Sequence, residues 1–122
     1  MSACQDPEKG KLDNRVMDYW NAKINKDFKV AYQYLSPGWR ENESENSYIR
    51  RIGASTVKWL AVEIKRKECK QTDLCKLFIE IIYEYQFKGV GSKKIKVPAL
   101  VGENWILKSN VWYHIPTETK LQ

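Results

Sequence analysis

Two cysteines, Cys69 and Cys75, stand at the boundary between two long segments that are rich in β-branched and aromatic residues. In the second segment, apolar and polar residues alternate, which indicates a strand with one buried face. The apolar positions are Leu77, Ile79, Ile81, Tyr83, Tyr85 and Phe87, and the polar positions are Lys76, Glu80, Glu84 and Gln86. The short polar stretch between the cysteines therefore predicts a hairpin with both thiols near its tip.

In this hairpin, Cys69 and Cys75 face each other across the strands at a separation that suits a disulfide. Direct pairing of the cysteines would, without a correction, place charged residues of the first strand beside the apolar face of the second. A β-bulge between positions 63 and 67 would restore the register and return Val62 and Ile64 to that face. We predict a disulfide; two reduced thiols in a cytosolic protein are the alternative. No metal site is expected, because one histidine and two cysteines at this spacing do not supply four ligands.

Three helices are predicted ahead of the strands. Apolar residues recur at helical spacing in residues 12–24 and again in residues 27–37, where Asp27 is a candidate N-cap and Pro37 ends the helix. A third, shorter helix fits residues 44–53, which begin with a serine cap and end with a glycine. Runs of helices followed by runs of strands indicate an α+β domain, with the helices on one face of a curved sheet.

Two further strands complete a four-stranded antiparallel sheet. Residues 95–108 and 111–115 are strand-like and are separated by a tight serine-asparagine turn. Pro98 and Gly102 indicate that the first of these two strands is bent or bulged. Helices laid across the mouth of such a curved sheet would enclose a pocket.

The chain length of 122 residues fits one domain. We expect a single domain over residues 12–117, between a flexible leader at 1–11 and a tail at 118–122. The formal net charge is +6, but the basic residues occur in short runs among apolar ones, as on a solvated sheet face. No nucleic-acid partner is expected, because no pattern of a nucleic-acid-binding module is present.

Two segments resemble a known superfamily. YWNAKINKDFKVAYQYLSPGWR is similar to the paired helices of the nuclear transport factor 2-like superfamily, and ENWILKSNVWYHI is similar to its last hairpin. The resemblance spans about residues 12–116, and it implies a cystatin-like, cone-shaped α+β fold. The superfamily also contains ketosteroid isomerases and scytalone dehydratases, so the resemblance does not define one function.

The segment SACQD at the N-terminus resembles the end of a bacterial lipobox, in which Cys4 would carry the lipid. The residue before this segment is Met1 instead of the usual leucine, and a chance match behind a native initiator methionine is the alternative. Together with the cysteine pair, this match predicts a location on the periplasmic side of the bacterial envelope. We expect a hydrophobic signal ahead of Ser2, and membrane contact only through the lipid anchor at Cys4; a cytoplasmic location is the alternative.

No set of residues matches a nucleophilic catalytic site, so no catalytic residue is assigned. The candidates for acid–base chemistry are His114 and the carboxylates Glu103 and Glu63. The candidate hydrogen-bond donors are Tyr19, Tyr32, Tyr83 and Tyr85. Strand alternation places His114 opposite Trp105 across the turn, and a structural role for this histidine is the interpretation that we favour.

Several aromatic side chains are predicted to line a pocket for a small apolar ligand, since such pockets are mostly apolar with a few polar groups. These residues are Tyr32, Trp59, Tyr83, Tyr85 and Trp105. The alternative is that the same rings fill the core. No cofactor is expected.

Two functions fit these patterns. The first is a non-catalytic envelope module that binds an unknown protein or a small apolar ligand. The second is a small pocket enzyme of the ketosteroid isomerase or dehydratase type, which would use Glu103 or His114. A homodimer formed through the sheet is compatible with either.

Overall fold

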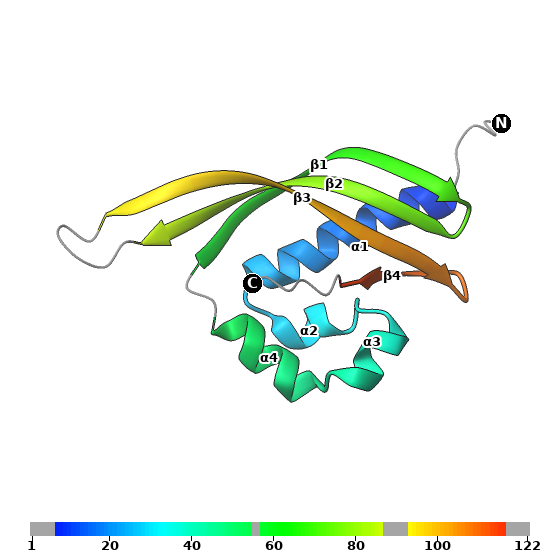
Figure 1. Cartoon of the computed structure of the whole chain (residues 1–122), viewed down its shortest axis with the longest axis horizontal. Helices are drawn as coiled ribbons and strands as arrows, with labels where there is room; N and C mark the ends of the chain where they lie inside the picture. The colour runs from blue at the N-terminus through cyan, green and yellow to red at the C-terminus, as the bar shows by residue number, and fades with distance from the viewer. Residues whose placement is uncertain (1–6, 55–56, 87–92, 117–122) are drawn as a thin grey trace.

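The computed structural model describes residues 7–54, 57–86 and 93–116, which form an α+β fold (Figure 1). Four helices precede the strands in this part of the chain: α1 (Pro7–Ile24), α2 (Phe28–Tyr32), α3 (Pro37–Asn42) and α4 (Glu45–Gly53). The strands are β1 (Val57–Gln71), β2 (Leu74–Gln86), β3 (Lys94–Lys108) and β4 (Val111–Ile115). They form one antiparallel sheet in the order β1-β2-β3-β4, as predicted.

The helical region differs from the three predicted helices, because α3 is an additional helix. The sequence pattern treats Pro37 as the end of a helix, whereas Pro37 is the first residue of α3. The Ser36 side chain caps this helix by accepting a hydrogen bond from the backbone N–H of Trp39 at 3.3 Å. A helix of six residues is defined by its cap and its proline more than by apolar periodicity, which is why the pattern misses it.

The start of the first helix also lies earlier than expected. Helix α1 begins at Pro7, so residues 7–11 of the predicted leader are helical, in keeping with the preference for proline in the first helical turn. Cys4 and the predicted C-terminal tail lie outside the described residues.

The register of the first two strands confirms the predicted hairpin. Cys69 pairs with Cys75, and the two residues form a disulfide with a Cα–Cα distance of 4.0 Å. A register shift between Ile64 and Arg66 lies inside the predicted interval. It returns Ile64 and Val62 to the face that covers the core, where both pack against the buried residues.

The last two strands pair through a tight turn. Ser109 and Asn110 have φ values of 51° and 66°, as in a two-residue type I′ hairpin turn, and this register places His114 opposite Trp105. Of the two alternatives for β3, the bend is present, because the strand curves over the helices (Figure 1). Its pairing with β2 runs past Pro98 and Gly102 without a register shift, so this pair of described strands has no bulge there.

The core lies between α1 and the concave face of the sheet. The apolar stripe of α1 packs there against the inward side chains of β2, β3 and β4. The most completely buried members of the core are Leu12, Val16, Ala31, Leu35, Tyr48, Cys75, Leu77, Ile79, Trp105 and Trp112. Helices α2 and α4 pack against each other beside α1, below the sheet in Figure 1. None of the helices in the described residues is long and apolar enough to cross a membrane.

Candidate ligand-binding pocket

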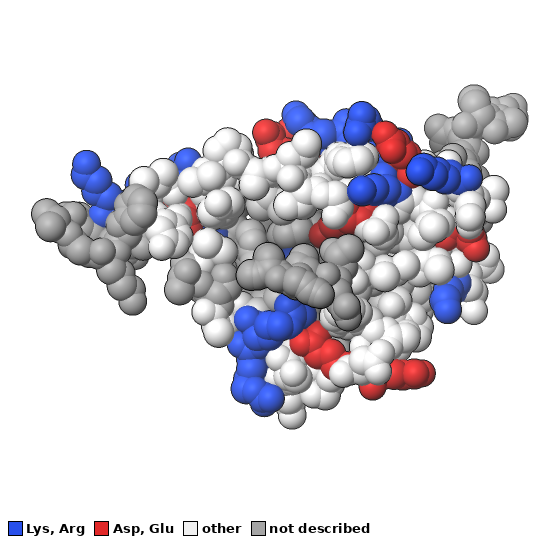
Figure 2. All heavy atoms as spheres, viewed as in Figure 1, with Lys and Arg blue, Asp and Glu red and all other residues white. Residues whose placement is uncertain are grey.

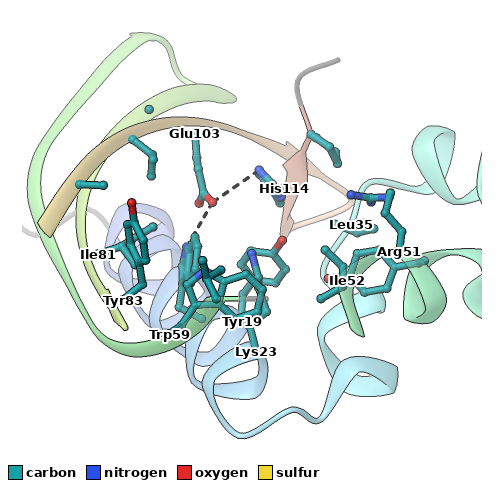
Figure 3. A pocket seen from close by; sticks show the side chains of 17 residues that line it. Tyr19, Lys23, Leu35, Arg51, Ile52, Trp59, Ile81, Tyr83, Glu103 and His114 are labelled. Atoms are coloured by element: carbon teal, nitrogen blue, oxygen red, sulfur yellow. Dashed lines mark hydrogen bonds and ion pairs between the residues drawn. The ribbon is translucent and has the colours of Figure 1, made fainter. Parts of the chain in front are cut away.

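A cavity of about 430 Å³ opens between the concave face of the sheet and helices α1 and α4 (Figure 3). This volume lies within the usual range for small-molecule sites. Its wall contains the aromatic residues Tyr19, Trp20, Tyr48, Trp59 and Tyr83. The polar side chains in the wall are Lys23, Arg51, Glu103 and His114. Most of the remaining lining is aliphatic, and Ile81 and Val101 contribute to it from the sheet.

Glu103 is a buried carboxylate on β3. Its Oε2 accepts a hydrogen bond from Trp20 Nε1, and its Oε1 accepts one from Trp105 Nε1, both at 3.1 Å. The Nε2 atom of His114 lies 3.8 Å from Oε2 (Figure 3). Each carboxylate oxygen therefore already has an indole donor, and one of these bonds ties β3 to α1.

His114 is held in place by its backbone. Its N–H donates to the Tyr34 carbonyl at 2.7 Å, and its own carbonyl accepts from the Ser36 N–H at 2.8 Å, so the connection between α2 and α3 fixes β4. Burial lowers the pKa of the His114 ring below its ordinary value of 6.5; Glu103 acts in the opposite direction. The ring is therefore neutral at pH 7, and its Nδ1 is buried without a hydrogen-bond partner among the described residues.

Lys23 is a buried cation near the end of α1, with 7% of its surface exposed. Its Nζ lies 3.7 Å from the ring centroid of Trp20, 4.7 Å from that of Trp59 and 5.0 Å from that of Tyr19. Burial lowers the pKa of Lys23 to about 8, while Glu103 partly opposes this shift. The ammonium is therefore mostly charged at pH 7 and is surrounded by ring faces, which attract cations.

Tyr48 on α4 is buried beside this group. Burial raises its pKa to about 12 and also raises the pKa of the neighbouring Tyr19. The two hydroxyl groups also shift each other's pKa. By distance and angle, the Tyr48 hydroxyl has no hydrogen-bond partner within the described ranges. Arg51, one turn further along α4, is paired with Glu43 at 2.8 Å and 3.0 Å.

Five of the residues predicted from sequence meet at this cavity: Trp59 and Tyr83 as pocket residues, Glu103 and His114 as acid–base candidates, and Tyr19 as a candidate hydrogen-bond donor. Glu63, the other carboxylate candidate, is exposed on β1 and lies 3.5 Å from Lys65.

Three predicted pocket residues lie elsewhere. The Tyr32 hydroxyl points to the α3–α4 connection, where it donates to the carbonyls of Arg40 and Glu43. Trp105 is fully buried behind Glu103, so it orients the carboxylate without lining the cavity. Tyr85 lies further along β2 and is 37% exposed; it lines a separate hollow on the projecting part of the strands.

Four further pocket residues were not predicted from the sequence: Trp20, Lys23, Tyr48 and Arg51. A signal for Lys23 was present, because positions 16, 19, 20 and 23 follow the helical spacing of the apolar stripe. A lysine on such a stripe is either buried or placed at an opening, and both descriptions apply here.

No group of three or more metal-binding side chains gathers anywhere in the described part of the chain. Figure 2 shows basic side chains in several separate groups, with acidic side chains between them, on the face that it displays. The charge on this face therefore does not form one continuous basic surface.

The comparisons with known proteins bear on the fold. No protein-family model matches the sequence, and no curated protein matches it. Among solved structures, the chain is similar to a SEC-C motif containing protein from Rhodopseudomonas palustris, with a TM-score of 0.57 and 13% identity. The match covers 81% of this chain and 70% of that chain. At this identity the likeness shows the fold alone.

Proposed function

We propose that this chain is a non-catalytic binding module whose cavity holds a small, largely apolar ligand. The observation that carries this proposal is the aromatic-walled cavity of about 430 Å³, which has the size and lining of a small-molecule site. Its rings come from α1, α4, β1 and β2, so the fold itself holds the walls in place.

The arrangement of Glu103 supports binding over catalysis. A general base needs an oxygen that can reach the substrate proton. Both oxygens of Glu103 already accept hydrogen bonds from indole groups, which suits a carboxylate that anchors two elements.

A pocket enzyme of the isomerase or dehydratase type is the second candidate. The observation in its favour is that Glu103, His114 and Tyr19 all line one cavity. This second candidate function predicts that the protein isomerises an added β,γ-unsaturated ketone and that Glu103→Gln abolishes this turnover. Absence of turnover in the folded wild-type protein would contradict it.

The proposed setting is the periplasmic side of the bacterial envelope, with a lipid anchor at Cys4. The disulfide between Cys69 and Cys75 supports an oxidising compartment. We also propose that the chain is related to the nuclear transport factor 2-like superfamily and shares its cone-shaped fold. In this proposal, two copies of the chain form a homodimer through the sheet.

Binding can be tested with N-phenyl-1-naphthylamine, a neutral probe whose fluorescence rises in apolar sites. Ala99 lines the cavity from β3, whereas its neighbour Leu100 is 65% exposed, so the two positions form a matched pair. We expect Ala99→Phe to weaken probe binding at least about tenfold and Leu100→Phe to leave it unchanged. Ala99→Leu, a smaller change, should show an intermediate loss if Ala99→Phe does not fold. Failure of the wild-type protein to bind the probe, or equal binding by the Ala99 variants, would overturn the proposal.

A further inference from the structure

We propose that the ligand of this cavity is an apolar acid, and that the Lys23 ammonium binds its carboxylate. This inference rests on the proposed binding function and goes beyond it by assigning the ligand a charge and a point of attachment. The supporting evidence is the placement of charge within the cavity.

Lys23 carries a buried charge that lacks a directly bonded partner in the described part of the chain. No hydrogen bond or ion pair to its Nζ is present within the described residues, although the side chain is almost fully buried. A buried charge is costly unless it is paired. Ring faces compensate only part of that cost, and the shortest of these contacts is the one between Lys23 Nζ and the Trp20 ring. The Glu103 carboxylate acts on this charge without forming an ion pair with it, so a directly bonded counter-ion is what the described protein groups do not supply.

The other charged side chains of the cavity, Arg51 and Glu103, already have bonded partners. Arg51 is already bonded to Glu43 through two N–H groups, and the oxygens of Glu103 are held by two indoles. His114 is neutral at pH 7 because burial lowers its pKa. Lys23 is thus the charged side chain of the cavity that has no hydrogen bond or ion pair among the described residues, although the Glu103 carboxylate acts on it at longer range.

The rest of the cavity lining, beside Lys23, is mostly aromatic and aliphatic. The rings of Trp59 and Tyr83 and the aliphatic side chain of Ile81 line the cavity together with Lys23 (Figure 3). Val101 adds a further aliphatic side chain, so the lining suits a flat hydrocarbon body beside the ammonium. The Tyr48 hydroxyl is buried without a partner and lines the same cavity, so it is available to donate to a polar atom of the ligand.

The sign of the charge excludes other ligand classes. A cation would be repelled by Lys23 and Arg51, and the Glu103 carboxylate in the same wall already accepts a hydrogen bond at each oxygen. A neutral apolar ligand would displace water from the ammonium and return no counter-charge. An anion of the same shape forms a charge-assisted hydrogen bond in a site shielded from solvent.

The test compares 2-naphthoate with 2-naphthamide, which have similar shapes and differ in charge. Binding is followed at pH 7 by quenching of the intrinsic tryptophan fluorescence, since Trp20 and Trp59 line the cavity. We expect the wild-type protein to bind the acid at least about tenfold more tightly than the amide. Lys23→Met should remove this preference, and Lys58→Met, at an exposed lysine next to Trp59, should retain it.

A pH series gives a second readout that does not depend on folding of the Lys23 variant. Raising the pH from 7 to 10 should weaken naphthoate binding at least about tenfold and leave naphthamide binding unchanged, because Lys23 loses its proton. The facing groups do not mimic this change: His114 is already neutral, burial keeps Tyr19 and Tyr48 protonated, and Arg51 remains charged beside Glu43. Glu103 is the remaining charged group that faces Lys23.

The outcomes separate the two proposals. Equal affinity for acid and amide, or an acid preference that survives both Lys23→Met and pH 10, overturns the assignment of Lys23 and leaves the binding function standing. If the protein binds none of 2-naphthoate, 2-naphthamide and N-phenyl-1-naphthylamine, both proposals are overturned.

Discussion

Trp20 on α1 and Glu103 on β3, 83 positions apart in the chain, are joined by a buried hydrogen bond of 3.1 Å from the indole Nε1 to Oε2. Trp105 donates to the other oxygen of the same carboxylate. One side chain thus connects the first helix to the third strand and forms part of the cavity wall.

Replacement of Glu103 should therefore reduce stability. Glu103→Ala removes the acceptor of two buried indole donors, and hydrogen bonds to charged groups contribute about 1.5–3 kcal/mol each, so we expect the free energy of unfolding to fall by at least about 2 kcal/mol. Urea denaturation measures this change. Glu63→Ala, at an exposed position, is the control and should stay within about 0.5 kcal/mol of the wild type. Equal stability of the two variants would show that the indole donors find other partners.

The disulfide should contribute modestly to stability. Cys69 and Cys75 are 6 positions apart, and closing so short a loop stabilises by about 2 kcal/mol in the chain-entropy model. We expect dithiothreitol to lower the midpoint of thermal unfolding of the wild-type protein. The variant Cys69→Ala/Cys75→Ala should unfold near the reduced midpoint and should not respond to the reductant. A wild-type protein that alkylates at both cysteines without reduction would show that the bond is absent in solution.

The buried histidine makes stability depend on pH on the acidic side. The pKa of His114 lies below 6.5 in the folded chain, so below pH 7 the unfolded chain binds a proton that the folded chain does not. The free energy of unfolding should fall as the pH decreases through 6.5. His114→Gln removes this contribution, so its stability relative to the wild type should improve from pH 7 to pH 5. A pH-independent difference between the two proteins would contradict a lowered pKa.

The sheet could be predicted because the alternation of apolar residues and the cross-strand pairing of the two cysteines agree. Alternation defines the inward face of β2, the paired cysteines set its register with β1, and the need to cover Val62 and Ile64 locates the bulge. A two-residue turn likewise sets the register of β4. Helix α3 has no comparable periodic signal, because its six residues depend on a cap and a proline.

The site was only partly predictable, because sequence does not tell which rings fill the core and which line a cavity. Tyr32 and Trp105 are aromatic residues of the kind that lines pockets. Packing nevertheless places Tyr32 against the α3–α4 connection and Trp105 behind Glu103. Lys23 was missed for the opposite reason. A charged residue is assigned to solvent by default, and only the packing of α1 under Trp59 shows that its ammonium is enclosed.

The enclosed ammonium should reduce the stability of the fold at neutral pH. Burial lowers the pKa of Lys23 from 10.5 to about 8, so its charged form is disfavoured in the folded chain. We expect Lys23→Met, which keeps the volume and removes the charge, to raise the free energy of unfolding at pH 7 by roughly 2–3 kcal/mol. Urea denaturation measures the gain, and the exposed Lys58→Met variant should show none.

The same pair of proteins should lose most of this difference at alkaline pH. Between about pH 8 and 10.5 the unfolded wild-type chain holds a proton on Lys23 that the folded chain has released, so wild-type stability rises with pH relative to Lys23→Met. Tyr19 and Tyr48 titrate alike in both proteins and cancel in the comparison. A Lys23→Met variant less stable than the wild type at pH 7 would mean that the rings of Trp20, Trp59 and Tyr19 more than compensate the buried charge. Lys23 would then be a structural cation of the fold, with no unmet demand for an anion.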